Sequence, residues 1–205
     1  MKKKTVALLM ALVLVFGVAV GGTIAYLTSD DAVVNTFTVG SVKITLDELD
    51  VDEDDNTADN VTMDDDTIRD KANGYKLMPG HEYTKDPIVH VDAASEDCYL
   101  FVTVVDEIAD IQADKTVAAQ MAEKGWALVE GDLYVYGTTE APVAVEADDD
   151  ITVFETFTIK GDIENEELAK YAGETITVTA YAVQADGFAG KTASEIWTTA
   201  FGTGA

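Results

Sequence analysis

Residues 98–106, CYLFVTVVD, are apolar at nearly every position, and this run constrains the fold more than any other feature of the sequence. In a strand, Tyr99, Phe101 and Val105 would face one side, and three further apolar side chains would face the other. A strand that is apolar on both sides is buried on both sides, because each face needs its own cover. The segment therefore predicts a central strand in a domain with more than one layer.

Short segments of alternating or apolar character, separated by turn signals, occur along the rest of the chain. The link 130–132 between two of them contains glycine, which is typical of a hairpin. Nine or ten such strands in one chain predict an all-β fold, a two-sheet antiparallel sandwich. The other predicted strands are 37–46, with a break at Gly40-Ser41, 75–78 before the turn Pro79-Gly80, 87–91, 126–129, 133–136, 141–146, 151–160, 174–185 and 196–201.

Two segments have helical signals instead. Residues 114–125, DKTVAAQMAEKG, have Asp114 at the start, an apolar pair four residues apart and Gly125 at the end. Residues 165–173, NEELAKYAG, begin with a capping residue and acidic side chains, which suit the positive end of a helix dipole. We expect both helices to be short and to lie in connections between strands.

The N-terminus has the order of a secretory signal peptide. Three lysines at positions 2–4 precede an apolar run, 6–20, and small residues follow, ending at Ala25. We expect cleavage between Ala25 and Tyr26. The alternative is a retained anchor, because residues 6–27 are long enough to cross a bilayer, which takes about 20 apolar residues.

Three strings resemble the camelysin and TasA-like exported proteins: GGTIAYLTSDD at 21–31, NTFTVGSVKITLDE at 35–48 and LMPG at 77–80. Those proteins are processed by a dedicated signal peptidase and include subunits of biofilm matrix fibres. The sequence departs from the family pattern at His81, where the family has aspartate. The resemblance implies a jelly-roll form of the sandwich, and residues 180–188 resemble the closing strand of such proteins.

The resemblance also implies how subunits join by donor-strand complementation. The N-terminal strand of one copy, freed by cleavage, would complete the sheet of the next copy. Such β-augmentation takes its affinity from main-chain hydrogen bonds and its register from alternate side chains. The alternative is that the same segment pairs within its own domain as an edge strand. The residues expected to join the neighbouring sheet are Tyr26, Leu27, Val33, Val34, Phe37 and Val39.

Removal of residues 1–25 would leave residues 26–205 as a single β-sandwich domain with 10 basic against 39 acidic side chains, a formal charge of −29. Such a surface repels nucleic acid and anionic lipid, because both bind through cationic side chains. Contact with the membrane is therefore expected only before cleavage. Cys98 is the single cysteine, so no disulfide can form within one chain. Its place in the predicted central strand indicates a buried, unreactive thiol.

Residues 47–66 are strongly acidic and contain little to bury, which predicts a solvated loop. Part of this loop has oxygen-bearing side chains at alternate positions, as calcium-binding loops do. The sixth position, which needs glycine, is Asp55, and the twelfth, which needs glutamate, is Val61. The sequence therefore predicts no cofactor beyond weak calcium binding, and a merely solvated loop is the alternative. The candidate ligands are Asp50, Asp52, Asp54 and Asn56.

No catalytic site is predicted. The enzyme to weigh is a camelysin-like metallopeptidase, but zinc hydrolysis needs two histidines one helical turn apart. His81 is followed at that spacing by Lys85, and His90 lies nine residues away. Trp126 and Trp197 are candidates for an aromatic sugar-binding surface, although aromatic residues at strand spacing mostly belong to a core.

These observations predict a secreted, fibre-forming structural subunit that assembles with itself in an extracellular matrix or at the cell surface. Signal peptidase is the expected partner during export, and other matrix proteins or a polysaccharide are candidate partners afterwards. The alternative functions are a monomeric secreted module that binds carbohydrate or divalent cations, and a metallopeptidase related to camelysin.

Overall fold

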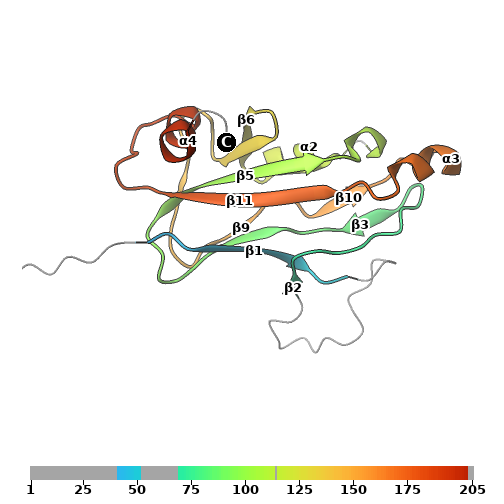
Figure 1. Cartoon of the computed structure of the whole chain (residues 1–205), viewed down its shortest axis with the longest axis horizontal. Helices are drawn as coiled ribbons and strands as arrows, with labels where there is room; N and C mark the ends of the chain where they lie inside the picture. The colour runs from blue at the N-terminus through green and yellow to red at the C-terminus, as the bar shows by residue number, and fades with distance from the viewer. Residues whose placement is uncertain (1–40, 52–68, 114, 203–205) are drawn as a thin grey trace, which may run out of the picture. The chain divides into compact units, whose positions relative to one another are not determined.

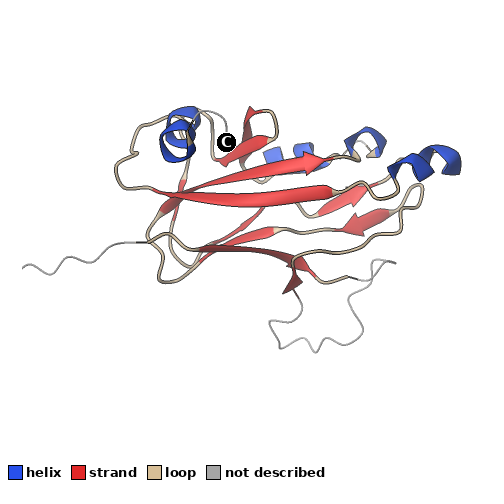
Figure 2. Ribbon diagram, in the orientation of Figure 1, coloured by secondary structure: helices blue, strands red, loops and turns tan. Residues whose placement is uncertain are grey.

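The computed structural model describes residues 41–51, 69–113 and 115–202, all within one of the two units into which the chain divides, Gly40–Ala205. This part consists of antiparallel sheets with a few short helices, as Figures 1 and 2 show. It is an all-β, two-sheet sandwich, which confirms the predicted fold class. The jelly-roll form stays a prediction.

β5 (Cys98–Asp106) is the strand on which the larger, second sheet is built. It pairs along its whole length with β11 (Ile176–Gln184) and, on its other side, with β7 (Leu133–Tyr136) and β8 (Ala144–Val145). β6 (Trp126–Glu130) completes the sheet through the predicted hairpin with β7. β11 therefore ends the sheet on one side, and β6 ends it on the other.

The first sheet has the strand order β2-β1-β4-β9. β1 (Ile44–Leu49) pairs with β4 (Ile88–Val91) over most of its length and with β2 (Arg69–Asp70) only at its end. β9 (Asp150–Thr152) pairs with the other side of β4. The first sheet is thus smaller than the second and is built around β4.

The two sheets enclose a hydrophobic core, in which Val89 of β4 and Leu100 of β5 are fully buried. Burying an aliphatic side chain of this size contributes about 1.5–3 kcal/mol. A second cluster fills the other face of β5 under the helix α4 (Ala193–Phe201). There Phe101 packs against Trp197, with ring centroids 5.3 Å apart. β5 is therefore covered on both faces, as its sequence predicts.

α4 shows that the prediction of a strand at 196–201 is wrong. The hydroxyl of Thr192 accepts a hydrogen bond from the Glu195 N–H at 3.3 Å, and the Glu195 carboxylate accepts one from the Thr192 N–H at 2.9 Å. This reciprocal capping box satisfies two backbone donors at the start of the helix. Ile196 and Trp197 then lie on its buried side.

Residues 151–160 are not one strand, as predicted, but two short ones. β9 pairs with β4, whereas β10 (Thr156–Thr158) pairs with β3 (Glu82–Thr84) in a separate ladder. Val153 and Phe154, between β9 and β10, are both fully buried. Two buried neighbours interrupt the alternation of faces, so the chain changes from one sheet partner to another at this point.

Residues 75–78 do not form the predicted strand. The hydroxyl of Tyr83 donates to the carbonyl of Lys76 at 2.6 Å and accepts from the N–H of Met78 at 2.7 Å. A side chain thus supplies hydrogen bonds that a neighbouring strand would otherwise make. The segment ends in the predicted turn, where Gly80 has φ 73°, a conformation that glycine adopts readily.

α2 (Val117–Glu123) begins with Thr116 as its cap, two residues after the expected Asp114. α3 (Asn165–Leu168) has no side-chain cap and continues into the 3-10 turn η3 (Ala169–Tyr171). Together with α4, the described residues contain three short α-helices, one more than predicted.

A further 3-10 turn, η2 (Ala109–Ile111), follows β5. The carboxylate of Asp106 accepts hydrogen bonds from the Ile108 N–H at 3.2 Å and from the Gln112 side chain at 2.8 Å, which fixes the chain on both sides of η2. None of the helices in the described ranges is long and apolar enough to cross a membrane.

Candidate functional site: an open seam between two sheet edges

β11 is an edge strand. Every second residue of it bonds to β5, and the residues in between turn their backbone groups away from the sheet. Next to its start, the carbonyl of Thr175 accepts from the Glu107 N–H at 3.0 Å; past its end, the Ala185 N–H donates to the Asp97 carbonyl at 2.7 Å. Hydrogen-bonded residues alternate in an antiparallel pair, so the odd-numbered residues of β11 bond to β5. The residues whose N–H and C=O groups turn away from the sheet are Ile176, Val178, Ala180, Ala182 and Gln184.

The core is incompletely covered along β11. The side chains of Val178 and Ala180 pack against the core between the sheets but are only partly buried. Leu100 and Val102, on the neighbouring β5, are fully buried in the same core. No strand among the described residues pairs with the outer edge of β11, so the core-facing side chains of this strand are exposed from that side.

β1 forms the opposite rim of this opening. The carbonyl of Lys43 accepts from the Asp92 N–H at 3.0 Å, so Ile44 and Leu46 turn their backbone groups away from β4. β2 covers that edge only from Glu48 onward. β1 and β11 contact each other. We call the opening between them the seam; the apolar side chains along its rims are Val42, Ile44, Leu46, Ile176, Val178, Ala180 and Ala182.

At one end the seam widens into a groove of about 1000 Å³. The end of β1 and the start of β11 line its walls, and residues 71–77 and the α3–η3 segment surround it. Phe157 and Ile108 give it an apolar part, whereas Asn73 and Lys85 bring polar groups to it. The groove therefore combines an apolar core surface with a small number of polar side chains, as ligand and peptide sites do.

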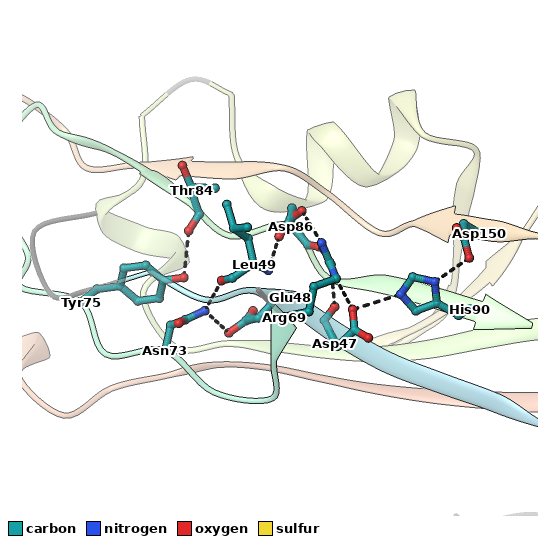
Figure 3. Close-up of polar contacts among 10 residues, drawn as sticks. All are labelled: Asp47, Glu48, Leu49, Arg69, Asn73, Tyr75, Thr84, Asp86, His90 and Asp150. Atoms are coloured by element: carbon teal, nitrogen blue, oxygen red, sulfur yellow. Dashed lines mark hydrogen bonds and ion pairs between the residues drawn. The ribbon is translucent and has the colours of Figure 1, made fainter. Parts of the chain in front are cut away.

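Charged side chains hold β1 in the first sheet, and Figure 3 shows their arrangement. Arg69 of β2 makes ion pairs with Asp47 of β1 and with Asp86, whose Oδ2 lies 3.1 Å from Nη1. Its Nη2 also donates to the main-chain carbonyls of Asp47 at 3.1 Å and Asp86 at 3.0 Å. Burial alone would lower the pKa of Arg69, but the hydrogen bonds and charges of both aspartates raise it. One guanidinium therefore ties three chain segments together.

His90 extends this network across β4. Its Nε2 lies 3.0 Å from Asp47 Oδ1, and its Nδ1 lies 2.5 Å from Asp150 Oδ1 on β9. Burial lowers the pKa of His90, but hydrogen bonds to the two carboxylates and their charges outweigh that effect and raise it. Burial likewise raises the pKa of Asp47, yet its hydrogen bonds to Arg69 and His90 lower it overall. The imidazolium of His90 and the carboxylate of Asp47 therefore favour their charged forms.

A second polar group fastens the end of β1. The buried carboxylate of Glu48 lies 2.5 Å from Lys85 Nζ and accepts from Asn73 Nδ2 at 3.0 Å. Asn73 also donates to the Leu49 carbonyl at 2.8 Å and accepts from the Val51 N–H at 3.0 Å. We call both groups together the charged clamp; its ionic members are Asp47, Glu48, Arg69, Lys85, Asp86, His90 and Asp150.

Most of the site residues predicted from the sequence lie outside the described residues. These are the cleavage residues, the donor residues and three of the four candidate calcium ligands: Ala25, Tyr26, Leu27, Val33, Val34, Phe37, Val39, Asp52, Asp54 and Asn56. Asp50 is described and partly buried. Within the described ranges, no three histidine, cysteine or carboxylate side chains come together as a metal site.

The two histidines make separate sets of contacts. His81 directly precedes β3, so His81–Lys85 is extended rather than helical. The ring of His81 packs edge-on against Tyr83, with centroids 4.4 Å apart, whereas His90 belongs to the clamp. Cys98 is fully buried in β5, and burial, with Asp97 nearby, raises the pKa of its thiol to about 11. This confirms the predicted burial of the thiol.

Neither the seam nor the clamp was predicted from the sequence. One signal for the clamp was present, because Arg69 is the single arginine of a chain with 39 acidic residues. A lone guanidinium among so many carboxylates favours a bidentate role that lysine cannot fill. For the seam, no local pattern reveals which edge of a sheet lacks a partner.

Comparisons of the chain with protein-family models, curated proteins and solved structures find no match. The interpretation of the site therefore depends on its own geometry and on the sequence.

Proposed function

We propose that this chain is a secreted structural subunit that forms fibres outside the cell by adding its N-terminal segment, as a strand, to the seam of the next copy. The observation that carries the proposal is the open edge of β11 beside an incompletely covered core. The signal-like N-terminus and the resemblance of residues 21–31 and 35–48 to the camelysin and TasA-like proteins support it from the sequence.

The edge of β11 lacks the features that normally prevent strand addition. Unpaired N–H and C=O groups favour pairing with another chain, and native proteins block such edges with charges, prolines or bulges. β11 reads ITVTAYAVQ and contains neither a charged residue nor a proline. Its register with β5 runs without a shift from Ile176 to Gln184. A regular nine-residue edge of this kind suits an incoming strand.

The distribution of charge supports the same contact. The chain has a formal charge of −26, so two copies repel each other over much of their surfaces. The uncharged β11 is a place where another chain can approach at lower electrostatic cost. A strand that enters the seam would also remove apolar side chains of both copies from water, at about 25 cal/mol per Å².

Assembly of the protein that begins at Tyr26 tests the proposal, with a Val34→Asp, Phe37→Asp double variant beside it. Electron microscopy and sedimentation should show fibres of the wild type and folded monomers of the variant, because the unpaired charge at position 37 enters an apolar seam at a high cost. Circular dichroism monitors the fold. Variant fibres as abundant as those of the wild type would reject strand addition. Loss of the β signal would show that the segment belongs to its own domain.

The groove favours a second function, a monomeric module that binds an extended carbohydrate. Its volume of about 1000 Å³ lies at the upper end of the range for ligand sites, and Tyr75 and Tyr171 line it together with Asn73. Calorimetry with matrix polysaccharides would detect such binding. A saturable signal that is lost in Tyr171→Ala, from a wild type that stays monomeric, would favour this function over fibre formation.

A further inference from the structure

Threonine side chains lie on the outer face of the second sheet beside the seam. Thr177 and Thr179 are exposed and occupy alternate positions of β11. In the register with β5, Thr103 lies opposite Thr179, and the exposed Val105 lies opposite Thr177. None of these four side chains carries a charge. This strip, the threonine face, borders the open edge.

The outer face of β1 has a different character. Lys43, Thr45 and Asp47 alternate with the core-facing residues of this strand. Asp47 is held by Arg69 and His90, and His90 lies opposite Thr45 in the register with β4. A strand added beside β1 would therefore meet charged groups that already have partners.

Within the segment 33–39, VVNTFTV, the stretch 36–39 has the two faces that a strand in the seam needs. Phe37 and Val39 share one parity, and Thr36 and Thr38 share the other. Successive side chains of a strand point to opposite faces of a sheet. When Phe37 and Val39 face the core, the two threonines face outward.

We infer that this segment of a second copy joins β11, rather than β1, and extends the threonine face by one strand. The inference rests on the proposed function, which does not specify the rim that receives the strand. On β11, the outward Thr36 and Thr38 would lie next to Thr177 and Thr179. Cross-strand threonine pairs stabilise antiparallel sheets, whereas on β1 the same threonines would lie beside the charged clamp.

Side-chain size on the inner face of the seam supports the same rim. β11 presents Ala180 and Ala182 toward the core after the larger Ile176 and Val178, whereas β1 presents only larger side chains such as Ile44 and Leu46. Large and small side chains must alternate across a core for it to fill at native density. An aromatic side chain such as that of Phe37 would therefore pack more readily beside these alanines than beside Ile44 and Leu46.

Disulfide trapping between two preparations of the protein beginning at Tyr26 tests the inference. The donor preparations carry Thr36→Cys or Thr38→Cys and are isotope-labelled. The acceptor preparations carry Thr177→Cys or Thr179→Cys on β11, or the matched Thr45→Cys on β1. Cys98 can stay in all of them, because it is fully buried and its thiol pKa is raised to about 11. A disulfide requires Cα atoms within about 7 Å, so only a neighbouring strand is trapped.

We expect mixed disulfides with at least one β11 acceptor, at about tenfold or greater yield than with Thr45→Cys, because the β1 position lies beyond disulfide reach. A dominant Thr45→Cys product would overturn the assignment to β11 and leave strand addition intact. Fibres with neither product would also overturn it. Without fibres or intermolecular products, the proposed function fails as well. Disulfides within one labelled chain would show that the segment covers its own seam and would contradict both.

Discussion

The two strands that border the seam have different outer surfaces. On its outer face β1 is held by Arg69 and His90, which pair with Asp47. At its end the buried Glu48 pairs with Lys85, and β2 covers that end. β11 has no charged side chain and is held by its ladder with β5 and by apolar packing, such as that of Tyr181 against Trp197. Among the described residues, each has backbone groups that no neighbouring strand pairs with, yet of the two only β1 carries the charges that discourage another strand.

This difference shows that, of the two rims, only that of β1 depends on ionic groups. The charged clamp positions β1, which pairs over only a few residues with β4. β11 needs no such support, because its pairing with β5 spans all nine residues. The longer strand can therefore leave its edge unprotected without loss of its own position, and this makes it the better acceptor.

The largest expected effect comes from breaking the clamp on the β1 side. Lys85→Ala leaves the carboxylate of Glu48, which is 3% exposed, without its cation. We expect the free energy of unfolding to fall by about 3 kcal/mol, because a buried charge without its partner is strongly destabilising. Urea denaturation followed by circular dichroism measures it. The control Lys170→Ala removes an exposed pair with Glu167 and should cause no measurable change. Equal losses in the two variants would contradict this account of the clamp.

Proline substitution distinguishes the two parities of β11. Ala180→Pro removes an N–H that faces the open edge, a position that edge strands tolerate. The subunit should stay folded but assemble about tenfold less well, since one intersubunit hydrogen bond is lost. Thr179→Pro removes an N–H that bonds to β5 and should instead destabilise the subunit. Thermal unfolding and sedimentation separate the two outcomes. If Ala180→Pro unfolds the subunit and Thr179→Pro impairs only assembly, the assignment of residues that bond to β5 is wrong.

A smaller effect is expected from the helix that covers the face of β11 rather than its edge. Thr192→Ala removes the capping box of α4 and should lower stability by about 1 kcal/mol. Glu164→Ala, at the cap position of α3 where no side-chain bond exists, is the matched control and should change little. Assembly should be unchanged in both, as measured by sedimentation. Impaired assembly in Thr192→Ala would place α4 in the contact.

The smallest effect is a pH dependence of the β1 side. The pKa of His90 is raised above its ordinary 6.5, so its contribution to stability is fully present below pH 6.5 and is lost as the pH rises through the raised value. The pKa of Asp47 is lowered from 3.8, so its contribution is lost only in stronger acid. The stability difference between wild type and His90→Gln should therefore shrink from pH 6 to pH 9. A stability difference that stays constant would show that the charge of His90 does not contribute to the clamp.

The strands that were predicted correctly are those in which the order of apolar and polar residues indicates which faces are buried. β5 has apolar residues on both faces and β11 alternates cleanly, so each was recognised to within two residues of its ends. The end of the chain was not, because the apolar and polar residues of 196–201 fit a short strand as well as a helix. The T-x-x-E pattern of Thr192 and Glu195 was the local signal that favours the helix.

The candidate site was harder to predict than the fold. Asp47, Arg69 and Asp86 come from three separate segments, and nothing in their spacing brings them together. β11 is an edge strand because it comes last in the strand order of its sheet. That order is a property of the whole chain rather than of residues 176–184. Local patterns therefore predicted the strands, whereas tertiary pairing determined the site.

The pairing of β5 with β11 also sets the order in which the native state is reached. Asp106 pairs with Ile176, 70 residues further along, and Cys98 pairs with the still later Gln184. Chains dominated by such distant contacts fold slowly, because loop closure must precede pairing. A chain synthesised from its N-terminus leaves one side of the apolar β5 unpaired until residues 176–184 emerge, and exposed strands of this kind aggregate. Protection of the nascent chain until β11 appears is therefore a requirement of its topology.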